Sequence, residues 1–171
     1  IKVVGWPMEY LHDILKPYQT IQKKNKIIFP HRLAPEKQLD IFKDLAASMP
    51  EYEWIVAQEQ GFTKDDYHRC LAESMIVFSA NLQETLGISM YEGAKLGAFP
   101  LVPDRLSYSE MWDDTFKYPS EWTIDWESYQ QNKPSLMNKI RNIMGSNHRD
   151  LPNSVRNVII NSTDNFFNGT K

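Results

Sequence analysis

Short apolar runs alternate with amphipathic stretches along the chain, and most of the runs end at a proline or a polar cluster. Such runs predict buried strands, whereas apolar positions that recur every three or four residues predict helices. The predicted strands are Ile1–Trp6, Lys26–Phe29, Trp54–Ala57, Met75–Ser79, Phe99–Val102 and a short edge strand at Phe116–Tyr118. The predicted helices are Pro35–Ser48, Asp65–Glu73, Leu86–Leu96, Ser135–Met144 and Pro152–Phe167.

This alternation of strands and helices predicts an α/β fold with a doubly wound, mostly parallel sheet of the Rossmann-like type. In such sheets a ligand binds outside the carboxyl ends of the strands. We therefore expect the functional residues directly after Phe29, Ala57, Ser79 and Val102. We expect residues 1–150 to form the ligand-binding domain and residues 151–171 to form a C-terminal helix that packs back toward a missing N-terminal domain.

The composition narrows the class of protein without identifying a function. The chain has 171 residues, 42% of them hydrophobic and 24% charged, as in ordinary globular domains. Its formal net charge of −3 provides no overall field that attracts nucleic acid or an anionic membrane. The single cysteine, Cys70, suits a reducing compartment, and no apolar run approaches the roughly 20 residues of a membrane span. We expect a cytoplasmic protein and, because the chain opens within a predicted strand at Ile1, a fragment of a larger one.

The loop after the predicted strand Lys26–Phe29 carries basic residues directly before a helix. Arg32 can offer a fork of donors to a phosphate, Lys37 a mobile charge, and His31 stands beside them. The start of a helix also favours an anion, because its amide groups have no partners within the helix. An ordinary solvated loop is the alternative reading. The glycine-rich fingerprints of dinucleotide and P-loop sites are absent.

The segment after the predicted strand Met75–Ser79 contains two glutamates near a helix start. Glu84 precedes the helix, and Glu92 lies on it, about 9 Å along the axis from Leu86. Carboxylates accept hydrogen bonds from hydroxyl groups and repel phosphates, so the pair suits a ligand with hydroxyl groups on both sides of a diphosphate. Gly87 would let such a ligand approach the backbone. In the alternative reading, Glu84 caps the helix and Glu92 is a surface residue.

Other reactive residues do not form a recognisable site. The four histidines and Cys70 lack the spacing of a zinc site, and neither Asp65–Asp66 nor Asp113–Asp114 is a D-x-D motif. We interpret these aspartates as charges at helix starts and Cys70 as a packing residue. The residues Asp104, Arg105, Tyr108 and Glu110 follow a strand and are expected at the rim of the ligand crevice, although capping of a short helix at Ser107 or Ser109 explains the second half of this segment equally well.

Together, these segments resemble a known enzyme family. Arg32 and Lys37 after a strand, and the E-x7-E pair within Q-E-T-L-G-I-S-M-Y-E-G-A-K-L-G-A-F-P-L-V-P, resemble the C-terminal half of GT-B glycosyltransferases of the group 1 (family 4) type. The stretch Gly97–Glu110 most closely resembles the subgroup that includes the tRNA-queuosine mannosyltransferases. The resemblance covers Lys26 to Tyr118.

The resemblance implies a retaining hexosyltransferase that requires no metal and no cofactor, with a UDP- or GDP-sugar as donor. It assigns the donor diphosphate to Arg32 and Lys37, the transferred sugar to Glu84 and the ribose to Glu92. The remaining donor-binding residues that it implies or suggests are His31, Gln58, Phe62, Thr85, Leu86, Gly87 and Ile88. The sequence departs from the family at Pro30, where a glycine is usual.

The resemblance also implies a missing N-terminal domain that binds the acceptor, which could be a modified nucleoside in tRNA or DNA, or a glycan. Two other functions stay open. One is a non-catalytic α/β module of the receiver or flavodoxin type, which binds a partner protein or a flavin. The other is a GT-B sugar-nucleotide epimerase, which uses the same donor site without a separate acceptor.

Overall fold

The computed structural model describes residues 10–146, and its centre is a five-stranded sheet in which every strand is parallel to its neighbours. The strands lie in the order β2-β1-β3-β4-β5. Their bounds are β1 Lys26–Phe29, β2 Glu53–Val56, β3 Ile76–Phe78, β4 Phe99–Pro103 and β5 Lys117–Tyr118. The order reverses between β1 and β3, which makes the carboxyl ends of these two strands the topological switch point.

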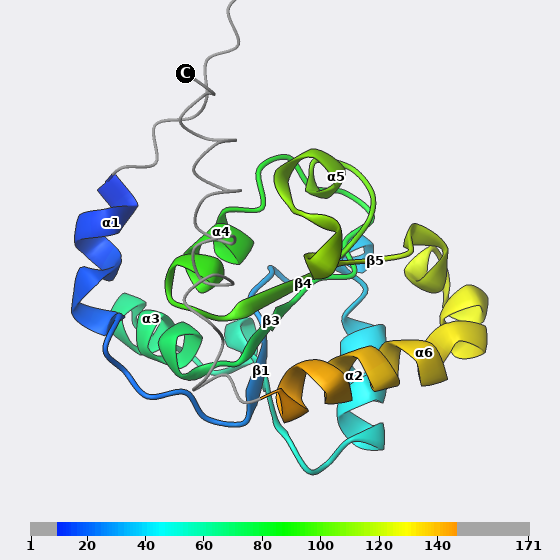
Figure 1. The fold of residues 1–171 in the computed structure, drawn as a ribbon, viewed down its shortest axis with the longest axis horizontal. Coiled ribbons are helices and arrows are strands. Elements are labelled where there is room, and N and C mark those ends of the chain that lie inside the picture. The colour runs from blue at the N-terminus through cyan, green and yellow to red at the C-terminus, as the bar shows by residue number, and fades with distance from the viewer. Residues whose placement is uncertain (1–9, 147–171) are drawn as a thin grey trace, which may run out of the picture.

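Helices cover both faces of the sheet (Figure 1), which confirms the predicted doubly wound α/β fold. The helices α2 and α6 pack together on one face, and α3 and α4 pack together on the other, with α1 against them. The bounds of the helices are α1 Tyr10–Leu15, α2 Leu39–Ser48, α3 Lys64–Glu73, α4 Ile88–Lys95, α5 Tyr108–Met111 and α6 Trp126–Gly145. Short 3₁₀ turns are formed by Lys16–Tyr18, Pro35–Lys37, Ala57–Glu59, Asp114–Phe116 and Ser120–Thr123.

The predicted helix Pro35–Ser48 is wrong in one respect, because the chain breaks at Gln38. Gln38 has a φ of 53°, in the left-handed region, and separates the 3₁₀ turn Pro35–Lys37 from α2. Its side-chain amide donates to the carbonyl oxygens of Ala80 and Thr123, each at 2.6 Å. These two hydrogen bonds fix the left-handed conformation of Gln38. Lys37 therefore lies in the 3₁₀ turn and is not part of α2.

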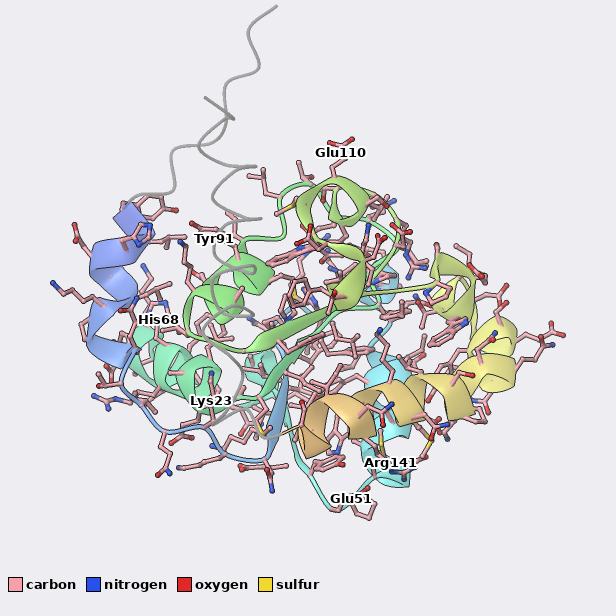
Figure 2. The ribbon with its side chains drawn as sticks, in the orientation of Figure 1. Lys23, Glu51, His68, Tyr91, Glu110 and Arg141 are labelled. Atoms are coloured by element: carbon pink, nitrogen blue, oxygen red, sulfur yellow. The ribbon has the colours of Figure 1, made fainter. Side chains whose placement is uncertain are left out.

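The last described helix, α6, is longer than the predicted Ser135–Met144. It begins after Asp125, whose carboxylate accepts from the amide of Ser128 at 2.7 Å and caps the first turn. Pro134 lacks an amide hydrogen and favours a helix end, but α6 continues through it. Buried side chains before and after Pro134 anchor the helix, at Tyr129 and Ile140 among others. At its far end Arg141 lies 3.4 Å from Glu51 (Figure 2).

The other predicted strands and helices agree with the structure to within about two residues, and the edge strand is confirmed at Lys117–Tyr118. Asp66 forms a capping box with Thr63 at the start of α3, which confirms the interpretation of Asp65–Asp66 as helix-start charges. Cys70 is buried in the core, as expected. The predicted strand Ile1–Trp6 and helix Pro152–Phe167 lie outside the described residues.

Candidate functional site

Two cavities open at the carboxyl edge of the sheet and meet at Pro30, which lines both of them. The α3 cavity, of about 420 Å³, is lined by Pro30, Ala57, Gln58, Gly61, Phe62, Thr63, Lys64 and Tyr67. The α4 cavity, of about 410 Å³, is lined by Pro30, His31, Arg32, Lys37, Glu84, Thr85, Leu86, Gly87, Ile88 and Ser89. Pro30 directly follows β1, so the two cavities lie at the switch point of the sheet.

In the α4 cavity, Lys37 and Glu84 form a largely buried ion pair. The Lys37 Nζ lies 3.3 Å from Glu84 Oε2 and donates to the carbonyl oxygen of Gln83 at 2.7 Å. The Glu84 carboxylate also accepts from the amides of Thr85 and Gly87, at 3.0 and 3.2 Å. Burial opposes the ionisation of Glu84, but the Lys37 charge and the two amides outweigh burial and hold the pKa of this carboxyl below its usual value.

The backbone before α4 offers further donors to the α4 cavity. Gly87 has a φ of 60° and forms the N-cap of α4, so that the chain turns sharply into the helix. Glu84 occupies the amides of Thr85 and Gly87. None of the hydrogen bonds among residues 10–146 is donated by the amides of Leu86, Ile88 or Ser89. A helix start with free amides is a suitable place for an anion.

Arg32 stands at the mouth of the α4 cavity, where its side chain is 71% exposed and pairs with Glu36. The cavity therefore has one buried cation, Lys37, and one exposed cation, Arg32, each next to a carboxylate. Arg32 could leave Glu36 and bind an anionic ligand at little cost in free energy, because exposed ion pairs contribute little to stability.

His31 is buried beneath the α4 cavity, and both of its ring nitrogens face protein atoms. Its Nε2 lies 3.1 Å from the carbonyl oxygen of Phe78, which can only accept, so Nε2 carries the hydrogen. Its Nδ1 then accepts from the side-chain amide of Asn81 at 3.3 Å. Burial and the nearby Lys37 charge lower the pKa of His31 to about 4, so the ring is neutral at pH 7.

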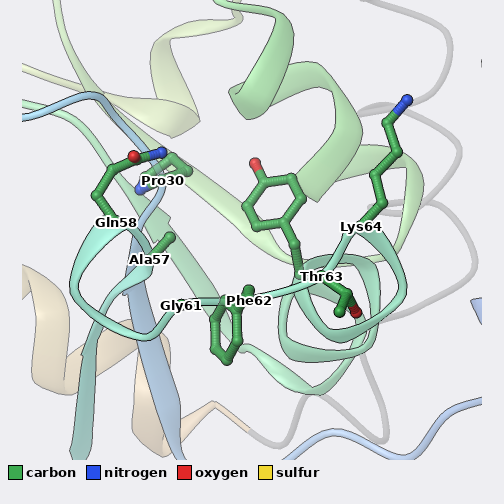
Figure 3. Close-up of a pocket in the computed structure, with 8 residues that line it drawn as sticks. Pro30, Ala57, Gln58, Gly61, Phe62, Thr63 and Lys64 are labelled. Carbon is green, nitrogen blue, oxygen red and sulfur yellow. The ribbon is translucent and has the colours of Figure 1, made fainter.

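The α3 cavity is less charged than the α4 cavity (Figure 3). The Gln58 side chain and Pro30 lie on one side of it, and Lys64 extends outward from the start of α3. Phe62 is half-buried and packs against the core. Gly61 adopts a φ of 64° in the turn between Gln58 and Phe62, with open space where a Cβ would lie. The lining suits a flat, polar-edged group better than an anion.

Glu92 lines neither cavity but lies behind the α3 cavity, next to Tyr67 and His68. The Tyr67 hydroxyl donates to Glu92 Oε2 at 3.4 Å, and the His68 ring nitrogen Nε2 lies 4.0 Å from Oε1. His68 projects from α3 (Figure 2), and burial together with Lys64 lowers the pKa of its ring below the usual value. Without a charged partner at short range, burial raises the pKa of Glu92 above its usual value.

Most of the residues that the sequence analysis singled out therefore come together at one edge of the sheet. The α4 cavity gathers His31, Arg32, Lys37, Glu84, Thr85, Leu86, Gly87 and Ile88, and the α3 cavity gathers Gln58 and Phe62. The sequence analysis did not select Tyr67 or Asn81. It placed Arg105 and Tyr108 at the rim of the crevice, but the Tyr108 side chain is completely buried, because its ring packs against Gly87. The position of Asn81 directly after a strand end is the signal that could have found it.

Within residues 10–146, no group of three or more His, Cys, Asp or Glu side chains is arranged to hold a metal ion. In the same range, no helix has both the length and the apolar character needed to cross a membrane. The chain matches no protein-family model.

Proposed function

We propose that the chain binds the nucleotide-sugar donor of a retaining, metal-independent glycosyltransferase, with a UDP- or GDP-linked hexose as the ligand. The observation that carries the proposal is the pair of unlike cavities that meet at Pro30. A nucleotide sugar has a flat base and a ribose at one end, a hexose at the other and a diphosphate between them. Its base needs a cavity with little charge, and its diphosphate and hexose need a charged one. The α3 cavity has the first property and the α4 cavity the second.

In this proposal the base enters the α3 cavity beside Gln58 and Phe62. Glu92 lies behind Tyr67, which lines the α3 cavity and holds Glu92 by a long hydrogen bond of 3.4 Å, so the Tyr67 hydroxyl has to move aside for the ribose hydroxyls to donate to Glu92. The raised pKa of Glu92 supports this role, because a buried carboxylate with few strong donors gains from new ones. Pro30, between the cavities, has no amide hydrogen and cannot donate to the diphosphate.

The diphosphate and the hexose occupy the α4 cavity. Glycosyl transfer breaks the bond between the anomeric carbon and the β-phosphate oxygen, and the electron pair leaves with the diphosphate. Lys37, Arg32 and the free amides at the start of α4 stabilise that developing charge, which is electrostatic catalysis by preorganised groups. Glu84 accepts from hexose hydroxyls and positions the anomeric carbon. The acceptor hydroxyl oxygen forms the new bond to the anomeric carbon, and its proton passes to the departing diphosphate oxygen.

The acceptor, for which a modified nucleoside in tRNA or DNA or a glycan is the candidate, would be aligned by a separate domain. The isolated chain is then expected to bind donor and to transfer sugar poorly, since alignment of the two reactants supplies much of the rate.

The fold does not choose among the functions considered. The strand order 2-1-3-4-5 is shared by flavodoxin-like domains, so only the properties of the site can distinguish a nucleotide-sugar-binding domain from a flavin-binding or partner-binding module. A partner-binding or flavin-binding module would have no affinity for a nucleoside diphosphate. A sugar-nucleotide epimerase would convert the donor without any acceptor.

Titration of the chain with GDP, UDP and their hexose conjugates in EDTA tests the proposal. We expect calorimetric binding of at least one diphosphate, together with a higher melting temperature. Guanosine and uridine, which lack the charge that Lys37 and Arg32 would bind, are the control ligands and should bind much more weakly. Absence of binding by every diphosphate would refute the donor site, and binding that chelation abolishes would refute its metal independence.

A further inference from the structure

We propose that Tyr108 is a positioning residue. From the protein interior it orients the carboxylate of Glu84, through a chain of hydrogen bonds that runs from Ser79 to Tyr108 to Glu84. The inference rests on the proposed function in one respect, namely that Glu84 holds the hexose of the donor. Tyr108 contacts no cavity itself, and its effect on a ligand would pass through Glu84 and Gly87.

Tyr108 begins α5, and its side chain is completely buried. Its neighbour Glu110 on the same helix points away from the molecule (Figure 2). The Tyr108 ring packs directly against Gly87, since a Cβ at Gly87 would lie 2.9 Å from the ring carbon Cε1. The ring therefore supports the left-handed turn from which α4 starts.

The hydroxyl of Tyr108 lies within reach of three polar side chains. It is 3.0 Å from Ser79 Oγ, 3.2 Å from the side-chain nitrogen of Asn81 and 3.4 Å from Glu84 Oε2. Burial and the charge of Glu84 raise the pKa of Tyr108 above its usual value, so its oxygen keeps the hydrogen. The hydroxyl has one hydrogen to give and two candidate acceptors, Ser79 and Glu84.

The direction of the chain follows from what each group can donate. The backbone amide of Asn81 donates to Ser79 Oγ at 3.2 Å. The Ser79 hydroxyl is then free to donate its own hydrogen to Tyr108 at 3.0 Å. Tyr108 in turn donates to Glu84, because an ionised carboxylate can only accept. Hydrogen bonds aligned in one direction polarise one another, and this chain ends on the carboxylate.

The lengths of the hydrogen bonds indicate where a ligand would compete. Glu84 Oε1 accepts from two backbone amides, whereas Oε2 accepts from Asn81 at 2.8 Å and has longer contacts to Lys37 and Tyr108. Two of the three contacts of Oε2, those to Lys37 and Tyr108, are thus long enough for a ligand to compete with them. A hexose hydroxyl that donates to Oε2 would depend on Tyr108 and Asn81 to keep that oxygen in place.

The support of Glu84 is itself anchored by Arg105, a largely buried guanidinium. Arg105 donates to the carbonyl oxygens of Asn81 and Ala80, at 2.8 and 2.9 Å, and to that of Ser120 at 2.8 Å. These bonds tie the loop after β3 to the segment that contains Tyr108. Asn81 is consequently fixed through its backbone, while its side-chain amide is left to donate to Glu84 and His31.

Tyr108→Phe tests the inference, since it removes the hydroxyl and keeps the ring against Gly87. Tyr118→Phe is the matched control. Tyr118 is equally buried in the same region and donates to the carbonyl oxygen of Ser79 at 2.8 Å, but it is not bonded to Glu84. Both variants lose one buried hydroxyl next to Ser79, so a general loss of stability should affect them alike.

The first readout is the titration of the Glu84 carboxyl by NMR in the ligand-free chain. We expect its pKa to rise in Tyr108→Phe, because the carboxylate loses a donor, and to be unchanged in Tyr118→Phe. Ser79→Ala interrupts the chain one step earlier and should move the pKa in the same direction by less, which also serves if Tyr108→Phe does not fold. Equal pKa values in the wild type, Tyr108→Phe and Ser79→Ala would overturn the inference.

The second readout is binding. Tyr108→Phe is expected to weaken the binding of a nucleotide sugar about fivefold and to leave the binding of the corresponding nucleoside diphosphate unchanged. Equal weakening of both ligands, or of neither, would overturn the inference. If the wild type binds no nucleotide sugar, the proposed function fails, whereas the titration of Glu84 still decides whether Tyr108 positions it.

Discussion

Glu84 and Glu92 are eight positions apart in the same segment and are both largely buried, yet they differ in the charges and backbone donors that face the carboxylate. Glu84 precedes α4 and is held by Lys37 and by two backbone amides. Glu92 lies within α4 and has the Tyr67 hydroxyl and the neutral His68 ring as neighbours. The pKa of Glu84 is lowered, and that of Glu92 is raised.

The difference shows that two carboxylates of one sequence motif can have opposite electrostatic environments, which under the proposed function would prepare them for different roles. Glu84 is ionised and fixed before a ligand arrives, which suits a residue that must position a reacting sugar. Glu92 carries an unfavourable buried charge that new hydroxyl donors would relieve, which suits a residue that contributes affinity. Substitutions around Glu84 and around Glu92 should therefore have different effects on stability and on ligand binding.

The largest effect is expected from Lys37→Ala, which leaves Glu84 buried without its cation. Removal of one partner from a buried ion pair should lower the free energy of unfolding by about 3 kcal/mol. Arg32→Ala is the matched control, because Arg32 lines the same cavity but is 71% exposed, and its loss should cost less than about 0.5 kcal/mol. Denaturant unfolding of both variants measures the difference. Equal stabilities would contradict the structural role of the Lys37–Glu84 pair.

A glycine in each cavity separates backbone strain from the contact with Tyr108. Gly61→Ala and Gly87→Ala both place a side chain at positive φ, which should cost about 1 kcal/mol each. At Gly61 the new Cβ meets open space, whereas at Gly87 it meets the Tyr108 ring at 2.9 Å, which should add about 1–2 kcal/mol. Thermal unfolding of the pair gives this difference directly. A Gly87→Ala variant no less stable than Gly61→Ala would rule out tight packing under α4.

The two glutamates should affect stability with opposite signs. Because the pKa of Glu84 is lowered on folding, its carboxylate stabilises the protein above the ordinary value of 4.5, and this stability is lost as the pH falls through the lower folded pKa. Because the pKa of Glu92 is raised, stability falls as the pH rises from 4.5 through the higher folded pKa. At pH 7, Glu84→Gln should lower the free energy of unfolding by about 1.5 kcal/mol, whereas Glu92→Gln should raise it.

Melting temperatures of the two variants between pH 3 and pH 8 check this expectation. Ligand binding provides a second test. Glu92→Gln should weaken the binding of a nucleoside diphosphate and of its sugar conjugate alike, by about tenfold. Glu84→Gln should weaken only the conjugate. Identical pH profiles, or identical ligand preferences, would mean that the contrast between the two environments has no functional meaning.

The fold and most of the cavity lining could be predicted because they depend on local patterns. The apolar runs specify the strands, and parallel strands bring their carboxyl ends to one edge, so the segments after Phe29, Ala57 and Ser79 had to converge. The polar residues in those segments were therefore identifiable without a structure. Helix ends were predictable where a local signal exists, as with Thr63 and Asp66.

What only the tertiary structure decided are the long-range contacts between these segments. Gln38 breaks a predicted helix because its amide bonds Ala80 and Thr123, 42 and 85 positions away. Tyr108 lies under Glu84 because the ring packs against Gly87, which no periodicity in the sequence indicates. The ionisation of Glu84 and Glu92 likewise depends on burial and on neighbours such as Lys37 and Tyr67, supplied by other elements. A sequence determines which groups are available, but their charge states and partners follow from distances that only the packed molecule defines.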